Sequence, residues 1–213
     1  VSFFQGFTTI AFVTFSAQVG FFLAGIILQW DWLWFASIPS AISAVILFAI
    51  CWEADHAPYS PGANDNASAA AMVLTLADVL KSEPLDHTRV WFLLSGCEEV
   101  QHYGMIDFLK RYKQELHDPK VLVFEMLGAA GPAWETKEGI VVPFKPHQDL
   151  VEIVEHIAEE NPNLGAYPSF IVGGNSEMAD AVRAGLPAIT FFGLTPDGQA
   201  PYWHQMTDTY DKI

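Results

Sequence analysis

The sequence feature that most constrains the fold is a pair of long apolar runs at the start of the chain. Residues 3–30 carry no charged side chain, and residues 33–52 form a second uncharged run. A helix needs about 20 predominantly apolar residues to cross a bilayer, and each run is long enough. Trp30 and Trp32 flank Asp31 between the runs, as is typical of a membrane interface. The pattern predicts a transmembrane helical hairpin over residues 1–52, and therefore an integral membrane protein.

A signal peptide and a pair of buried core helices are the alternatives to this hairpin. A signal peptide would begin with a basic region, but every Lys and Arg of the chain lies at or beyond Lys81. Buried core helices in a soluble protein are the second alternative. Because no basic residue flanks the runs, the positive-inside rule assigns the hairpin no orientation.

The rest of the chain, residues 53–213, has the composition of an acidic soluble domain. The formal net charge of the 213 residues is −15. Such a domain lacks the basic surface that nucleic acids require, so we expect no nucleic-acid partner. Two cysteines, Cys51 and Cys97, are too few for a disulfide framework, and we expect both to be free, buried thiols.

From Glu53 onward, segments of helical and strand pattern alternate along the chain. The pattern predicts helices at 68–81, 102–116, 148–160 and 176–184, and strands at 88–95, 120–126, 139–144, 169–172 and 187–193. Alternation of this kind predicts an α/β fold with a mixed, mostly parallel sheet and helices on both faces. Ligands bind such sheets beyond the carboxyl ends of the strands.

Several potential metal ligands occur at loops and strand ends. Asp65 lies in a Pro-Gly turn before a predicted helix, Glu98 and Glu99 follow the predicted strand 88–95, and Glu125 ends the next one. Adjacent carboxylates are unfavourable unless positive charge meets them. With His204 near the end of the chain, they form a donor set that suits zinc or another divalent ion. A helix cap is the alternative role for Asp65.

Five stretches of the sequence resemble the co-catalytic di-zinc metallopeptidases, a family that includes secreted bacterial aminopeptidases, aminopeptidase Y and glutamate carboxypeptidase II. These stretches are Pro61–Ala71, Gly96–Gly104, Phe124–Gly128, Gly173–Phe192 and Trp203–Asp208. The resemblance implies a zinc-peptidase-like α/β domain at 53–213. It also implies an exopeptidase, an aminopeptidase in particular, with two zinc ions and a peptide substrate. Two alternatives are a glutaminyl-cyclase-like acyltransferase with one zinc ion and a non-catalytic receptor or scaffold.

The resemblance also implies roles for individual residues. Asp65 would bridge two metal ions, Glu98 would be the general base, and Glu99, Glu125 and His204 would be the remaining ligands. The bond between Asp65 and Asn66 would be cis, as is common in the family.

Three further residues are expected to have supporting roles, two of them by the same resemblance and His102 by its position in the sequence. Asp208 would hold a ligand by hydrogen bonding, and Glu177 would orient one from a position where the family often has Asp. His102, which closely follows the glutamate pair, would line the pocket.

The sequence departs from the family at one ligand. The family has a histidine in a His-aromatic-Asp motif before the bridging aspartate, and no such motif occurs here. Either His56 takes this place or the histidine precedes Val1. In the second case the hairpin is inserted between the first two motifs, and we expect the domain to lack its N-terminal strands.

Overall fold

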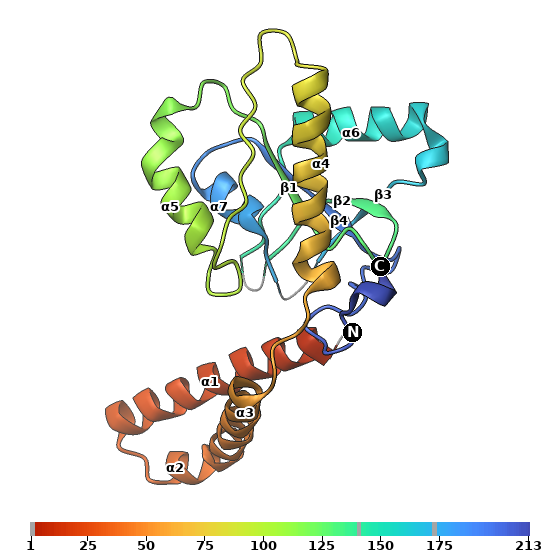
Figure 1. Cartoon of the computed structure of the whole chain (residues 1–213). Coiled ribbons are helices and arrows are strands. Elements are labelled where there is room, and N and C mark those ends of the chain that lie inside the picture. Colours follow the sequence, from red (N-terminus) through yellow and green to blue (C-terminus); the bar gives the residue numbers. More distant parts are fainter. Residues whose placement is uncertain (1–2, 140–141, 172–173) are drawn as a thin grey trace. The chain divides into compact units, whose positions relative to one another are not determined.

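The computed structural model describes residues 3–139, 142–171 and 174–213, and it divides into two compact units, Val1–Tyr59 and Ser60–Ile213. The first unit consists of the helices α1 (Phe3–Leu28), α2 (Trp32–Ala36) and α3 (Ile38–His56). Helices α1 and α3 run antiparallel, as the hairpin prediction requires, with α2 in the connection between them (Figure 1).

Small and polar side chains join α1 to α3 within an otherwise apolar surface. Ser40 Oγ donates to Gln18 Oε1 at 2.6 Å, and the hydroxyls of Thr14 and Ser43 lie 2.9 Å apart. The helical segments Thr9–Leu28 and Ile38–His56 are long and apolar enough to cross a membrane. A core helix or a signal sequence can have the same length and composition. Only 11% and 6% of these segments is buried, so the described helices have little of the burial expected of core helices.

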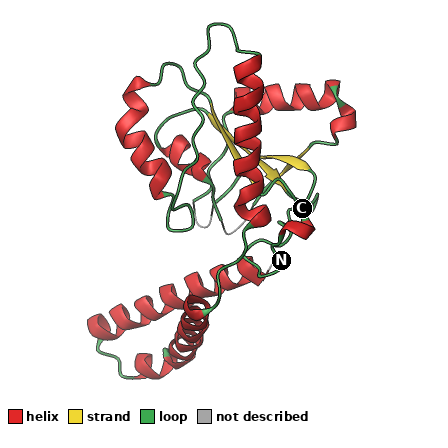
Figure 2. Cartoon of the chain, in the orientation of Figure 1, coloured by secondary structure: helices red, strands yellow, loops and turns green. Residues whose placement is uncertain are grey.

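Among the described residues, the second unit contains one mixed sheet of four strands: β1 (Val121–Glu125), β2 (Pro132–Glu135), β3 (Tyr167–Ser169) and β4 (Ala188–Gly193). Their order is β1-β4-β2-β3, in which the β1–β4 and β2–β3 pairs are parallel and the β4–β2 pair is antiparallel. The strands are yellow in Figure 2. The predicted mixed, mostly parallel sheet is therefore confirmed.

Helices cover both faces of this sheet. The main ones are α4 (Ala69–Ser82), α5 (Tyr103–Tyr112), α6 (Gln148–Glu160) and α7 (Glu177–Arg183), and short helical turns occur at Ala63–Ser68, Lys113–Glu115, Pro162–Leu164 and Tyr210–Lys212. Ala188 and Ile189 of β4 point to opposite faces because side chains alternate along a strand. Ala188 packs with residues of α5 and α7, whereas Ile189 packs against Leu150 of α6.

The prediction of a strand at 88–95 is wrong. The segment is extended, but it forms no ladder with any strand in the described residues, and Phe92 and Leu94 are 44% and 55% exposed. Trp91 instead packs on Phe108 and Tyr112 of α5. The segment has the apolar, β-branched and aromatic residues of a strand, but a strand is stabilised by a partner in register, which composition does not provide.

Other strand predictions were displaced or missed. The predicted strand 139–144 is a single antiparallel bridge between Glu138 and Phe144, and residues 140–141 lie outside the described residues. A strand was predicted at 169–172, but β3 ends at Ser169, so the prediction was displaced; Val172 and Gly173 are also outside the described residues. Strand β2 was not predicted, because Gly131 and Pro132 are typical of a turn.

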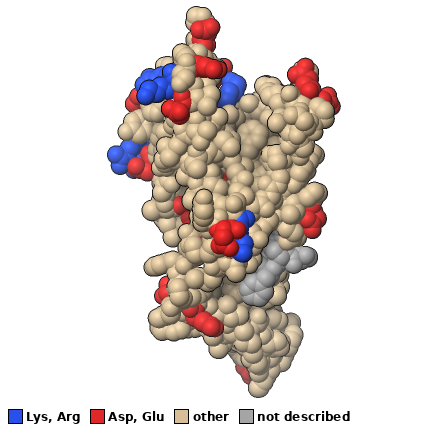
Figure 3. Space-filling view, turned by 45° about the vertical axis from the view of Figure 1, so that its right-hand side comes forward, with Lys and Arg blue, Asp and Glu red and all other residues tan. Residues whose placement is uncertain are grey.

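The structure shows where the charged residues lie and how far the two thiols are exposed. Most of the surface seen in Figure 3 is uncharged, and all Lys and Arg residues belong to the α/β unit. Cys51 and Cys97 are free, as expected, but both are exposed, so the expected burial is wrong. Cys51 lies in an apolar helix whose surface is itself exposed, and Cys97 lies in the loop after the extended segment.

Candidate metal centre

The loop before α4 presents Asp65 in a fixed backbone conformation. Gly62 adopts a φ of 71°, and a Cβ placed on it would lie 3.0 Å from the Asp65 carbonyl oxygen, so the turn favours glycine. The peptide bond between Asp65 and Asn66 is cis, which confirms the expectation from the family resemblance. The N-cap residue of α4 is Ser68, so Asp65 does not take the helix-cap position that was its alternative role.

Asp208 holds this loop by two hydrogen bonds. Its buried carboxylate accepts hydrogen bonds from the backbone N–H groups of Asn64, at 2.6 Å, and Asp65, at 2.9 Å. The side chain of Asn66 bridges to the end of β1, since its amide donates to Glu125 and its oxygen accepts from Met126 N at 3.1 Å. The loop is therefore fastened both to the chain end and to the carboxyl end of β1.

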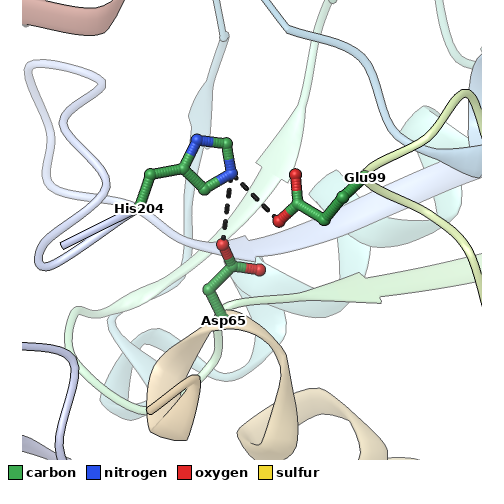
Figure 4. A group of neighbouring side chains, drawn as sticks. All are labelled: Asp65, Glu99 and His204. Atoms are coloured by element: carbon green, nitrogen blue, oxygen red, sulfur yellow. Dashed lines mark hydrogen bonds and ion pairs between the residues drawn. The ribbon is translucent and has the colours of Figure 1, made fainter. Parts of the chain in front are cut away.

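Three of the predicted ligands come together from distant parts of the chain (Figure 4). His204 Nε2 lies 3.0 Å from Glu99 Oε1 and 3.6 Å from Asp65 Oδ2. One ligand atom from each of Asp65, Glu99 and His204 lies within 4.8 Å of the other two. We call these three residues the metal triad.

The pKa values of Asp65 and His204 are both raised above their ordinary values. Burial raises the pKa of Asp65 to about 6, and the negative charge of Glu99 adds to this effect. Burial would lower the pKa of His204, but the hydrogen bond to Glu99 and the charge of Asp65 outweigh it and raise the value. A divalent cation would relieve this repulsion, and two carboxylates with one imidazole are ligands that zinc accepts.

Glu98 lies beside the metal triad without being part of it. It precedes Glu99 directly in the chain, and its charge contributes to the raised pKa values of Asp65 and His204. Its Oε1 lies 3.2 Å from His102 Nε2, and its side chain is 31% exposed. Glu98 thus lies next to the potential ligand Glu99, contacts His102 and is accessible to solvent.

Glu125, a predicted ligand, stays outside the metal triad. It is 6% exposed, it accepts from the Asn66 amide, and its Oε1 is buried without a hydrogen-bond partner in the described residues. Burial, and then the charges of Glu177 and Glu98, raise its pKa well above the ordinary value. Glu177 in turn accepts a hydrogen bond from Ser95 Oγ at 2.5 Å. An unpaired oxygen in such surroundings favours a proton or a cation.

Asp180 and His56 differ in how far the sequence could reveal their roles. Asp180, which contacts His102, was not identified; as a carboxylate among the buried residues Met178, Ala179 and Ala181 it required a partner, and that was the available signal. His56 lies at the end of α3 in the other unit, where its ring stacks on Trp52. Its role as a ligand stays a prediction.

Comparisons with known proteins place this geometry in context. Residues 52–213 match the family model described as Peptidase family M28. The chain is 28% identical over 162 residues to Aminopeptidase YwaD of Bacillus subtilis (strain 168), an alignment that covers 75% of this chain and 35% of YwaD. The chain thus spans about a third of the length of this relative.

Two solved structures share the fold of the α/β unit. BSAP, a zinc aminopeptidase from Bacillus subtilis, matches with a TM-score of 0.57 and 23% identity over 74% of this chain and 39% of that one. The LapA aminopeptidase of Legionella pneumophila matches with a TM-score of 0.59 and 20% identity over 72% of this chain and 41% of that one.

Proposed function

The chain belongs to peptidase family M28, and on that premise we propose that it is a zinc-dependent exopeptidase, specifically an aminopeptidase, anchored in a membrane by residues 3–52. The observation that carries this proposal is the convergence of Asp65, Glu99 and His204. The similarity to BSAP, which is a zinc aminopeptidase, supports the choice of metal and activity.

The metal triad fits a zinc ion by its chemistry and its spacing. Catalytic zinc sites combine three protein ligands with one open position. Two atoms bound to one tetrahedral zinc ion at the usual bond lengths lie roughly 3–4 Å apart. The separations of 3.0 Å and 3.6 Å from His204 Nε2 to the carboxylate oxygens match this spacing.

We include a second zinc ion, shared by Asp65 and Glu125, in the proposal. The buried, unpartnered Oε1 of Glu125 supports it, as does the charge effect of Asp65 on the pKa of Glu125. Asp65 would then bridge the two ions with its two oxygens.

Glu98 performs the proton transfers in the proposed mechanism. A zinc ion held by the metal triad would acidify a water molecule and polarise the scissile carbonyl. Glu98 accepts the proton of the water and later donates it to the leaving amine. Its position beside the metal triad, together with its solvent-accessible carboxylate, suits that role.

The charge of the site favours the amino end of a peptide as substrate. The carboxyl groups of Glu98, Glu125 and Glu177 add to those of the metal triad, and no Lys or Arg forms an ion pair with any of these glutamates in the described residues. A protonated α-amino group complements this negative field, whereas a carboxylate terminus is repelled by it.

Replacement of the proposed base tests the function. We expect the full chain with zinc to hydrolyse aminoacyl-p-nitroanilides, and Glu98→Gln to reduce the rate by roughly 10²–10⁴ with unchanged zinc content. Glu159→Gln makes the same chemical change at an exposed position of α6 and should leave the rate unchanged. Near-full activity of Glu98→Gln would remove Glu98 from this role.

One observation keeps the glutaminyl-cyclase-like acyltransferase as a second candidate. The described residues contain one group of three potential ligands, which is enough for a single ion. Metal analysis of the purified full chain separates the candidates. Two zinc ions per chain favour the peptidase, one favours the acyltransferase, and none favours a non-catalytic receptor or scaffold.

A further inference from the structure

A buried histidine connects Glu98 to a carboxylate on a different helix. His102 Nε2 lies 3.2 Å from Glu98 Oε1, and His102 Nδ1 lies 2.5 Å from Asp180 Oδ2. His102 and Asp180 are only 8% and 6% exposed. Neither of them belongs to the metal triad. Their contacts therefore form a polar chain that is separate from the triad and that ends at the proposed base, Glu98.

Backbone and packing fix the position of this histidine. His102 adopts a φ of 55° at the N-cap of α5, and its N–H donates to the Glu98 carbonyl oxygen at 2.9 Å. Asp180 lies on α7, which packs against α5 through the shared core of Met105 and Met178. The ring is therefore held between the loop that carries Glu98 and a helix that packs on the sheet.

The surroundings of the ring favour its doubly protonated form. Burial by itself would lower the pKa of His102, but the hydrogen bonds to Glu98 and Asp180 raise it to about 9. The charged groups that face the ring are these two carboxylates, and Arg183 Nη1 lies 2.9 Å from the other oxygen of Asp180. With both ring nitrogens protonated, His102 donates to both carboxylates at once.

We propose that His102, held by Asp180, is a positioning residue that fixes one oxygen of the Glu98 carboxylate and leaves the other for proton transfer. The inference rests on the proposed function, because it assigns a task to His102 through Glu98. A base that is fixed in this way is oriented before the substrate arrives, and correct orientation is a large part of catalytic efficiency. The competing role is structural, with the His102–Asp180 pair serving only to join α5 to α7.

A double-mutant cycle distinguishes positioning from a structural role. We expect His102→Leu to lower kcat by about 10- to 100-fold, the range typical of residues that support an active group, with KM and zinc content nearly unchanged. In the Glu98→Gln background the same substitution should cause no further loss. His117→Leu, at an exposed loop position, is the matched control. A full additional loss in the Glu98→Gln background would show a structural role and overturn the inference.

Two milder variants cover the case in which His102→Leu does not fold. His102→Gln keeps an N–H donor and should recover part of kcat. Asp180→Asn keeps the size of the side chain but removes the charge that holds His102, so it should lower kcat while KM stays similar. Wild-type kcat in both variants would overturn the inference.

Nuclear magnetic resonance of the imidazole nitrogens provides a readout that is independent of activity. In the zinc-free full chain, His102 should titrate near pH 9. Glu98→Gln and Asp180→Asn should each lower that pKa, since each removes a negative partner of the imidazolium. A pKa for His102 that Glu98→Gln leaves unchanged would overturn the inference. If the wild-type chain hydrolyses nothing, the proposed function fails, and this titration decides separately whether His102 holds Glu98.

Discussion

Among single residues, Asp208 has the most direct structural effect on the metal triad. It is fully buried, and its two oxygens accept the N–H groups of Asn64 and Asp65. These bonds orient the backbone that carries the proposed bridging ligand. A residue that contacts no metal ion can therefore control metal binding.

We predict that Asp208→Asn destabilises the chain and weakens zinc binding. The amide directs an N–H group at one of the two buried donors, and an unsatisfied buried donor costs about 1–3 kcal/mol in the free energy of unfolding. Zinc affinity should fall by about 10- to 100-fold. Urea unfolding and zinc titration measure the two effects, with the exposed Asp211→Asn as control. Equal stability and affinity in the two variants would contradict this account of Asp208.

The sequence predicted some site residues better than others, for physical reasons. Asp65, Glu99 and His204 have ligand chemistry and occur in loops, and both properties are local. The partnership of His102 with Asp180 depends on the packing of α5 against α7, which joins residues 78 positions apart. Glu125 was predicted as a ligand from its type, but the Asn66 amide that occupies one of its oxygens could not be inferred from the spacing.

At the scale of elements, two buried carboxyl groups connect β2 to the start of α7. Glu135 and Glu138 are 0% and 1% exposed. Glu138 Oε2 accepts hydrogen bonds from the N–H and hydroxyl groups of Ser176, at 2.9 Å and 2.8 Å, and Ser176 is the N-cap residue of α7. Burial is the main cause that raises the pKa of both carboxyl groups, and for Glu135 the charge of Glu138 adds to it.

These raised pKa values predict that the zinc-free chain loses stability as the pH rises. Above the ordinary value of 4.5, the unfolded chain releases protons that the folded chain retains. The free energy of unfolding therefore falls with rising pH, by about 1.4 kcal/mol for each unit by which a pKa is raised. Asp65 and Glu125 contribute with the same sign.

Glu135→Gln provides the test of this pH dependence. The amide resembles the protonated carboxyl group, so the variant should be more stable than the wild type at pH 8 and show a smaller loss of stability between pH 5 and pH 8. Urea unfolding in the presence of a chelator measures both. A wild-type stability that rises over this range, or an unchanged slope in Glu135→Gln, would contradict the prediction.

The observed helices and strands show which sequence patterns are sufficient to predict an element. The amphipathic patterns that predicted helices at 68–81 and 148–160 agree closely with α4 and α6, because one helix face is specified by local spacing. The segment 88–95 has equally clear strand composition but no partner in the described residues. Strand formation depends on long-range pairing, and this is the information that a local pattern lacks.

At the scale of the whole molecule, the exposed apolar helices of the first unit predict membrane integration. The full chain should remain in the membrane pellet after a carbonate wash and be released by detergent. Val45, which is 68% exposed on α3, provides a sharper test. Val45→Arg should weaken insertion by about 2.5–3.5 kcal/mol if this position lies near the bilayer centre, whereas Tyr59→Arg, outside the helix, should not. A monodisperse chain in detergent-free buffer would contradict the membrane hairpin.

The division of the chain into two units was visible in its composition, but the full set of proposed metal ligands was not. Only one formal charge, Asp31, occurs in residues 1–52, and this contrast predicted a boundary close to the start of the acidic domain. The structure separates its two units after Tyr59. A ligand belongs to a site by its three-dimensional proximity to Asp65, and spacing along the chain does not provide that information.

Asp65, Glu99 and His204 are proposed to bind one zinc ion together. X-ray diffraction from the full chain, crystallised with zinc and measured on both sides of the zinc absorption edge, would locate that ion. We predict an anomalous peak within bonding distance, about 2.0–2.2 Å, of an atom from each of the three residues. A second peak between Asp65 and Glu125 would identify the second ion. Zinc bound elsewhere, with His204 still hydrogen-bonded to Glu99 and no peak among the three side chains, would contradict the claim.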